Sequence, residues 1–225
     1  MTGRVRRPFD CVLFDLDGTL VDSATDLARA AEAMRAARGL PPIPIADYRA
    51  HAGSGARGML AVAFGVASES PGYGALHDEF IEAYAARMFD YTEPFDGVAA
   101  LLQTLNGAGL PWGIVTNKAE RLALALARAM PLLAGARVII GGDTTPHAKP
   151  HPAPLLEAAR RIGADPARCL YVGDDERDMR AGRAAGMGTA AALYGYLGAQ
   201  ADVAQWPADW RVRVPGEVLT LLGLA

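Results

Sequence analysis

Phe14-Asp-Leu-Asp-Gly-Thr-Leu-Val-Asp-Ser23 continues a short apolar run, Cys11–Phe14, that has the length of a buried strand. Gly18 lets the backbone turn where that strand ends, so the carboxylates of Asp15 and Asp17 can face one pocket. A hairpin with an Asp-Gly turn would use the same residues. A calcium loop fits less well, because Gly18 is the fourth residue counted from Asp15 whereas the EF-hand loop has its glycine at the sixth position. The segment therefore indicates two carboxylates at the carboxyl end of a strand.

Further along the chain, apolar runs of strand length alternate with stretches of helical spacing. The other predicted strands are Gly113–Val115, Val138–Ile140, Cys169–Val172, Thr189–Leu193 and Arg211–Val214. The predicted helices, in which apolar residues recur every three or four positions, are Val98–Leu105, Ala119–Met130, Pro154–Ile162, Asp178–Ala185 and Glu217–Leu224. This alternation predicts an α/β fold with a Rossmann-like parallel sheet covered by helices on both faces. Ligands are then expected outside the carboxyl ends of the strands.

The alternation stops between Val21 and Pro94, where we expect no strand. Three helices are predicted there instead, at about Ser23–Arg38, Asp47–Phe64 and Tyr73–Phe89. The first opens with Ser23-Ala-Thr-Asp26, a pattern typical of a capping box. About seventy residues are far too many for an ordinary loop. We therefore predict an all-helical insert at residues 22–94, which acts as a cap, and a core formed by residues 1–21 and 95–225.

The composition excludes several classes of protein. The chain has 225 residues, 51% of them hydrophobic, and a mean hydropathy of +0.11, so it can bury a core without the apolar excess of a membrane protein. Its net charge of −3 offers no positive field to gather nucleic acid. The N-terminus is basic, but Asp10, Asp15 and Asp17 interrupt the apolar stretch that an export signal needs. We expect a cytoplasmic protein with no nucleic-acid or membrane partner, and Cys11 and Cys169 in their apolar runs fit a reducing compartment.

Lysine is rare in this chain, because just two of its 22 basic side chains, Lys118 and Lys149, are lysines. A site that needs a compact ammonium charge cannot accept the planar guanidinium of arginine, so both positions call for a chemical explanation. Lys118 follows Thr116 and Asn117 at the end of a predicted strand. Those two side chains could cap the next helix, and a helix N-terminus of this kind could also bind a phosphate oxygen.

The second lysine lies in a proline-rich loop, His147-Ala-Lys-Pro-His-Pro152. Pro150 and Pro152 stiffen the backbone around Lys149, so its ammonium loses less entropy when it pairs with an anion. The two histidines of this loop have no third residue at the spacing of a metal site, and we interpret them as loop residues.

A second acidic segment, Tyr171-Val-Gly-Asp-Asp-Glu-Arg-Asp178, ends another predicted strand. Acidic residues at a helix N-terminus would account for part of it. If Asp174 meets Asp15 and Asp17, however, carboxylates ~4 Å apart repel one another by a few kcal/mol at an effective dielectric constant of about 20. Such a group needs a cation, and an all-oxygen set of ligands suits Mg²⁺.

His51-Ala-Gly-Ser-Gly-Ala-Arg-Gly58 contains the pattern G-x-G-x-x-G of dinucleotide-binding folds. No strand precedes it and it lies within the predicted helical insert, so a dinucleotide site is not indicated. We interpret the segment as a flexible loop that brings Arg57, and as a second candidate His51, near a ligand.

The Asp-Leu-Asp-Gly-Thr, Thr-Asn-Lys, Lys-Pro and Gly-Asp-Asp segments, in this order, resemble the haloacid dehalogenase superfamily from about Phe9 to at least Leu193. Within this superfamily, the chain resembles the phosphatases that have a helical cap after the first strand. It is most similar to phosphoglycolate phosphatases. The glycine-rich segment of the insert and Tyr194-Gly-Tyr196 also resemble bacterial N-acetylmuramic acid 6-phosphate phosphatases. Phosphoglycolate phosphatases commonly have a small hydroxyl residue where this chain has Asp175, so the resemblance leaves the substrate open.

The resemblance implies a role for each acidic residue. Asp15 would attack phosphorus and form an aspartyl-phosphate, and Asp17 would protonate the leaving alkoxide and then take a proton from the hydrolytic water. The ligands of a Mg²⁺ ion would be the Asp15 carboxylate, the main-chain carbonyl of Asp17 and the Asp174 carboxylate, with Asp178 in support.

The resemblance also implies how the substrate is held. Thr116, Asn117 and Lys149 would bind the phosphoryl oxygens, and Lys149 would shield Asp15 from the incoming anion. The expected partner is a small phosphorylated metabolite covered by the insert, and we expect the chain to be a monomer or a homodimer.

Other activities remain open for the same residues. A phosphotransferase such as a hexose-phosphate mutase would also begin at Asp15, but would pass the phosphoryl group to a sugar rather than to water. A dehalogenase is less suited, because a halide leaving group has no use for the acid at Asp17. A non-catalytic sensor of phosphorylated metabolites would not need Asp15, Asp17, Lys149 and Asp174 all to be intact.

Overall fold

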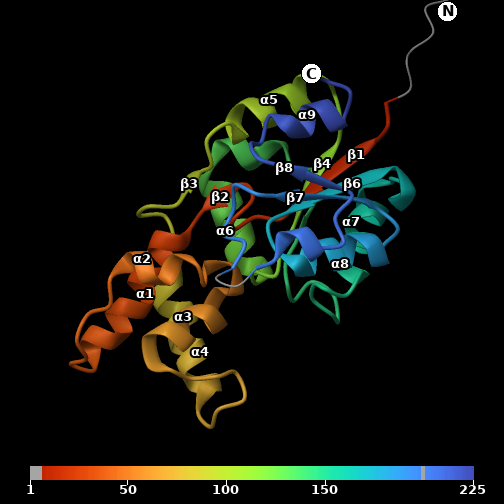
Figure 1. Cartoon of the computed structure of the whole chain (residues 1–225). Helices are drawn as coiled ribbons and strands as arrows, with labels where there is room; N and C mark the ends of the chain where they lie inside the picture. Colours follow the sequence, from red (N-terminus) through yellow and green to blue (C-terminus); the bar gives the residue numbers. More distant parts are fainter. Residues whose placement is uncertain (1–6, 199–200) are drawn as a thin grey trace, which may run out of the picture.

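A central sheet of six strands organises the protein (Figure 1). The structure is a computed structural model that describes residues 7–198 and 201–225, so most of the basic N-terminal stretch lies outside the described residues. In spatial order the strands are β5 (Ile139–Ile140), β4 (Trp112–Val115), β1 (Cys11–Phe14), β6 (Cys169–Gly173), β7 (Gly188–Ala192) and β8 (Trp210–Val212). Every neighbouring pair is parallel. The predicted α/β class is therefore confirmed.

The order of the strands determines where a ligand can bind. The chain starts at β1 in the middle of the sheet, builds outward through β4 and β5, and then returns to the other side of β1 to add β6, β7 and β8. The carboxyl ends of β4, β1 and β6 therefore lie side by side at the point where the strand order reverses. Open parallel sheets bind their ligands at this point.

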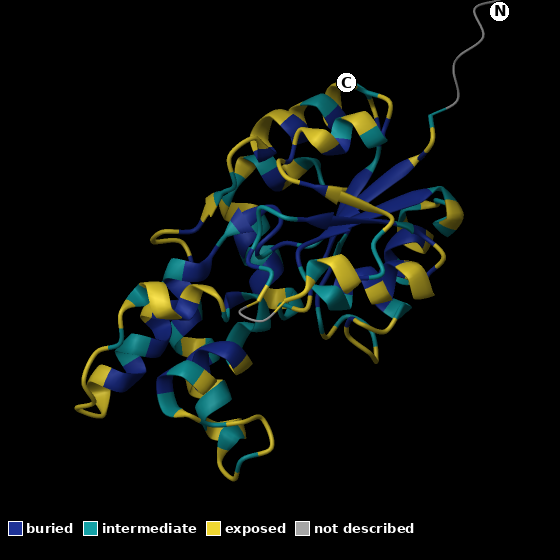
Figure 2. Cartoon of the chain, in the orientation of Figure 1, coloured by how far each residue is buried: buried dark blue, intermediate teal, exposed yellow. Residues whose placement is uncertain are grey.

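The two faces of the sheet carry separate apolar cores. Val12 and Phe14 belong to the core beneath three helices, whereas Cys11 and Leu13 belong to the core on the other face. The first core is covered by α5 (Val98–Gly107), α6 (Glu120–Ala129) and α9 (Glu217–Leu221), and the second by α7 (Ala153–Ile162) and α8 (Glu176–Ala184). Figure 2 shows the central strands β1, β4 and β6 buried between these helices, whose outer sides are exposed. Three short 3-10 helices complete the core: η2 (Pro131–Gly135), η3 (Pro166–Arg168) and η4 (Val203–Gln205).

The helical insert lies beyond the carboxyl ends of the strands, at the lower left of Figure 1. Its elements are α1 (Ala24–Ala37), α2 (Ile45–Arg49), η1 (Ala52–Ser54), α3 (Gly55–Phe64) and α4 (Tyr73–Ala85). Helix α1 packs against α2, α3 and α4, and these helices contribute buried residues to the apolar core, which Figure 2 colours dark blue.

Two short strands at the ends of the insert correct the expectation that this region holds no strand. β2 (Val21–Asp22) and β3 (Glu93–Pro94) form an antiparallel pair, in which Val21 lies opposite Pro94 and Asp22 opposite Glu93. Strands of two residues have no periodicity of their own, so a pattern-based prediction has nothing to detect.

The predicted capping box at the start of α1 is wrong. The Ser23 hydroxyl donates to Asp17 Oδ1 at 2.5 Å, and Asp26 accepts from Tyr91 and Thr92 of the segment that leaves the insert. The N–H groups of Ser23 and Ala24 donate instead to the hydroxyl of Tyr196, at 2.7 and 3.0 Å. A side chain from the core thus caps this helix.

The helix predicted at residues 47–64 is also wrong, because α2, η1 and α3 are three separate elements. The glycine-rich segment is not the expected loop either. Gly55 and Gly58 are part of α3, and Arg57 lies in the first turn of that helix.

No helix of the described ranges is both long enough and apolar enough to span a bilayer.

Candidate active site

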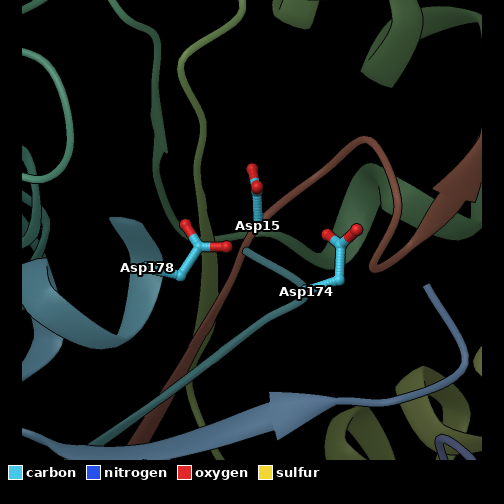
Figure 3. Close-up of side chains that lie close together, drawn as sticks. All are labelled: Asp15, Asp174 and Asp178. Atoms are coloured by element: carbon cyan, nitrogen blue, oxygen red, sulfur yellow. The ribbon is translucent and has the colours of Figure 1, made fainter. Parts of the chain in front are cut away.

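Three carboxylates meet beyond the carboxyl ends of the central strands. Asp15 follows β1, Asp174 follows β6, and Asp178 lies in the first turn of α8. One oxygen atom of each lies within 4.8 Å of those of the other two, and Figure 3 shows the three side chains converging. Gly18 has a φ of +85°, as expected for a turn that directs the segment after β1 back toward Asp174.

The burial of these carboxylates has an electrostatic cost. Burial, together with the charge of Asp178, raises the pKa of Asp15 to about 7, even though Lys149 opposes the change. Burial and the charges of Asp15 and Asp178 also raise the pKa of Asp174 well above its usual range. A cation would relieve this repulsion, and a donor set made of carboxylate oxygens matches the preference of Mg²⁺. The residues present therefore fit a Mg²⁺ site.

Lys149 compensates part of this negative charge. Its buried ammonium lies 3.0 Å from Asp15 Oδ1 and 2.7 Å from Asp178 Oδ1, and it also donates to the hydroxyl of Tyr171 at 2.8 Å. These carboxylates raise its pKa although burial acts in the opposite direction, so the ammonium stays charged.

The side chain of Asn117 positions the loop that carries Lys149. Its amide donates to the Lys149 carbonyl at 3.0 Å, and its oxygen accepts from the Lys149 N–H at 2.9 Å. These two bonds hold the Asn117 side chain against the backbone of the Lys149 loop. Thr116 is buried at the end of β4, where its oxygen accepts from the Lys118 N–H at 3.2 Å and its own proton is left to donate.

The carboxylate of Asp17 lies outside the cluster of three and faces the helical insert. Both of its oxygens lie 2.9 Å from the ammonium of Lys118, which also donates to the hydroxyl of Tyr84 in α4 at 3.0 Å. Asp17 raises the pKa of Lys118 although burial works against it. Lys118 therefore has a chemical explanation as well, since a compact ammonium fits between the carboxylate and the insert.

Sequence reasoning missed the residues that orient these groups. Thr19 donates to Asp174 Oδ1 at 3.0 Å, and the N–H of Tyr196 donates to Asp174 Oδ2 at 2.8 Å. Tyr171, which accepts from Lys149, donates to the carbonyl of Val115 at 2.8 Å. Thr19 belongs to the Asp-Gly-Thr segment and could have been noticed there. Tyr171, by contrast, has the sequence pattern of an ordinary core residue.

A cavity of about 590 Å³ opens above these groups, between the core and the insert. It is lined on the core side by Asp15, Asp17, Thr116 and Lys149. Arg57 lines the cavity from α3, whereas His51 is not among the residues that line it. Over the described ranges Arg57 forms no ion pair, unlike the other two cavity arginines, Arg121 with Glu82 and Arg177 with Asp175. The charge of Arg57 instead acts on Glu69 of the insert without forming an ion pair.

Comparisons with known proteins agree with this geometry. The model of the haloacid dehalogenase-like hydrolase family matches residues 9–186. A phosphoglycolate phosphatase from Xanthomonas campestris is 48% identical over 207 residues, which cover 92% of this chain and 93% of that protein. An N-acetylmuramic acid 6-phosphate phosphatase from Pseudomonas aeruginosa is 41% identical over 220 residues, which cover 98% and 97%. The crystal structure of a predicted phosphoglycolate phosphatase from Haemophilus somnus superposes with a TM-score of 0.83 at 26% identity, covering 95% of this chain and 98% of that one.

Proposed function

Since the chain belongs to the haloacid dehalogenase-like hydrolase family, as its sequence predicts, we propose that it is a Mg²⁺-dependent phosphomonoesterase that forms an aspartyl-phosphate. One observation carries this proposal. One oxygen each of Asp15, Asp174 and Asp178 lies within 4.8 Å of the others, and the ammonium of Lys149 lies 3.0 Å from Asp15. Phosphoryl transfer requires three groups close together: a nucleophilic carboxylate, a cation site and a fixed positive charge.

In the first step, a carboxylate oxygen of Asp15 attacks phosphorus while the bond from phosphorus to the leaving oxygen breaks. Asp17 gives its proton to that oxygen, so the product leaves as an alcohol. In the second step, Asp17 takes a proton from a water molecule that attacks the same phosphorus, and the bond to Asp15 breaks. Inorganic phosphate leaves and both aspartates return to their initial states.

The phosphoryl oxygens would be held by Lys149, the Thr116 hydroxyl and the Asn117 main-chain N–H. Mg²⁺ would be held by the carboxylates of Asp15 and Asp174 and the main-chain carbonyl of Asp17, with Asp178 in support. When bound, the ion supplies positive charge that reduces the repulsion between the carboxylate and the phosphoryl group as they approach each other. Asp178 also pairs with Lys149 at 2.7 Å, which keeps the ammonium directed at the site.

The substrate we propose is a small phosphorylated metabolite with a carboxylate, which Arg57 would bind from the helical insert acting as a cap. 2-Phosphoglycolate fits this description, as does N-acetylmuramic acid 6-phosphate. The cavity of about 590 Å³ has room for either of them. We further propose that the enzyme is cytoplasmic and acts as a monomer or a homodimer.

A screen of phosphorylated metabolites tests the proposal. 2-Phosphoglycolate, hexose phosphates and N-acetylmuramic acid 6-phosphate are each incubated with the protein in Mg²⁺ or in EDTA, and inorganic phosphate is measured. We expect release that needs Mg²⁺. A sugar phosphate that is isomerised without release of phosphate would indicate a phosphotransferase instead.

Two variants sharpen this screen. Asp15→Asn removes the nucleophile and should release no phosphate from any compound. Asp10→Asn is its matched control, because Asp10 is a half-exposed carboxylate just before β1 that pairs with Arg168 at 2.8 Å, away from the cavity. Residual turnover by Asp15→Asn would contradict the assignment of the nucleophile.

A further inference from the structure

Asp175 forms a two-point ion pair with Arg177. Arg177 Nε lies 2.7 Å from Asp175 Oδ1, and Arg177 Nη2 lies 2.7 Å from Asp175 Oδ2. Asp175 also caps α8 by accepting from the Arg177 N–H at 2.8 Å. Both ends of the guanidinium fork are thus fixed, and the side chain has little freedom left to lose.

The same guanidinium reaches across to the helical insert. Arg177 Nη2 uses its second proton to donate to the carbonyl of Gly53 in η1 at 2.6 Å, which joins two residues 124 positions apart. Gly53 also faces the core, since a Cβ at that position would be in ordinary van der Waals contact with Asp175 Oδ2 and Tyr196 Cβ, at 3.8 Å from each. Asp175, Arg177 and Gly53 all line the cavity.

This link differs from the Arg121–Glu82 ion pair, which also joins the core to the insert. Arg121 and Glu82 lie 2.8 Å apart, but their side chains are 54% and 76% exposed. Solvent screens such a pair, and it adds little stability. The side chains of Arg177 and Asp175 are 28% and 26% exposed, and the charged donor meets a main-chain carbonyl, so their link is the stronger one.

We propose that Asp175 and Arg177 form a clamp that fastens the insert to the core at Gly53 and so sets how often the cavity opens. Asp175 orients the guanidinium, and Arg177 makes the bridge. The clamp acts on access and on retention of the substrate, and neither residue takes part in the bond-breaking steps. Both are positioning residues.

Hydrogen exchange of the full-length protein, read by mass spectrometry without substrate, tests the clamp directly. Arg177→Met removes the bridge, whereas Asp175→Asn keeps an acceptor for the cap of α8 but loses the charge that orients Arg177. We expect the amides of residues 52–55 to exchange roughly tenfold faster in both variants, with α7 unchanged. Arg180→Met is the matched control, because Arg180 lies in the same helix and pairs with Glu176 on the surface. Exchange at the parent rate in both Arg177→Met and Asp175→Asn would overturn the proposal.

Steady-state kinetics give a second readout. With whichever phosphorylated metabolite the parent enzyme hydrolyses, Arg177→Met should raise KM by roughly tenfold and change kcat by less than about twofold, because the bridge acts before and after the chemical steps. A collapse of kcat at unchanged KM would place Arg177 on the reacting atoms and overturn the clamp. If the parent releases no phosphate from any compound, the proposed function fails, but the exchange experiment still decides the clamp.

Discussion

The ammonium of Lys118 lies 2.9 Å from both carboxylate oxygens of Asp17 and 3.0 Å from the hydroxyl of Tyr84. Asp17 belongs to the core and Tyr84 to α4 of the insert, so one cation holds the expected acid and the insert together. The position of the Asp17 carboxylate therefore depends on where α4 lies.

Replacement of this lysine should slow catalysis more than it weakens binding. In Lys118→Met, the Asp17 carboxylate loses the partner that orients it, and we expect kcat to fall roughly 100-fold with KM changed by less than about threefold. Lys118→Arg should recover part of the loss, since it restores the charge but not the compact fit. Arg121→Met, which removes an exposed ion pair with Glu82, is the control and should retain the parent kcat. A parent-like kcat in Lys118→Met would contradict the role of this contact.

Without divalent ions, stability should fall as the pH rises. The folded protein keeps a proton on Asp15 up to a pKa of about 7, whereas an unfolded chain releases it near pH 4. Between these values the folded state binds more protons than the unfolded state, so the free energy of unfolding decreases as the pH increases. Mg²⁺ binds the deprotonated carboxylates and should therefore raise the melting temperature more at pH 8 than at pH 5. Thermal denaturation followed by circular dichroism measures this, and an equal effect of Mg²⁺ at both pH values would contradict it.

Gly195 should not tolerate a side chain. A Cβ there would lie 2.2 Å from the carbonyl oxygen of Gly18 and 2.3 Å from Asp174 Cβ, so Gly195→Ala must displace the backbone or the carboxylate. We expect a loss of at least ~2 kcal/mol in the free energy of unfolding and a Mg²⁺ affinity reduced by roughly tenfold or more. Gly74→Ala is the matched control, because Gly74 lies in α4 with nothing within 4 Å of the new methyl group, and alanine should add ~0.5–1 kcal/mol. Urea denaturation measures the free energy of unfolding of both variants. A parent-like midpoint for Gly195→Ala would refute the clash.

Arg57→Ala should weaken substrate binding selectively. Arg57 lines the cavity without an ion pair in the described part of the chain, so its loss should raise KM for a carboxylate-bearing substrate by roughly tenfold or more. Arg121→Ala, which removes a cavity arginine already paired with Glu82, should leave KM within about twofold. Equal KM values for the parent and for Arg57→Ala would remove this residue from the binding site.

Most strands of the core could be predicted because they combine an apolar run with a polar or glycine residue at the end, although β8, with Arg211 at its centre, does not. Cys11–Phe14 and Cys169–Gly173 illustrate this, since burial on both faces leaves no polar residue inside the run. The insert was harder to predict. The separation of α2, η1 and α3 depends on turns at His51 and Ser54, where no proline marks a boundary and the apolar spacing continues.

The residues of the candidate site also fall into those that the sequence pattern could identify and those that it could not. Asp15, Thr116 and Asp174 could be singled out because chemically active residue types directly follow strands, and parallel strands bring such residues to one edge. Tyr84 and Tyr171 could not, since their rings fill the core and only the tertiary structure shows where each hydroxyl points. The ion pair of Asp17 with Lys118 could not be predicted either, because it joins segments far apart in the sequence.

The pairing of β2 with β3 makes the helical insert modular. Val21 lies opposite Pro94, so the chain departs from the core and rejoins it at neighbouring backbone positions. Any polypeptide whose two ends lie as close together as β2 and β3 can be inserted here without altering the register of the six-stranded sheet. The insert, which we propose selects the substrate, can therefore be exchanged while the core that carries Asp15 is kept, and a laboratory chimaera could transfer specificity by the same route.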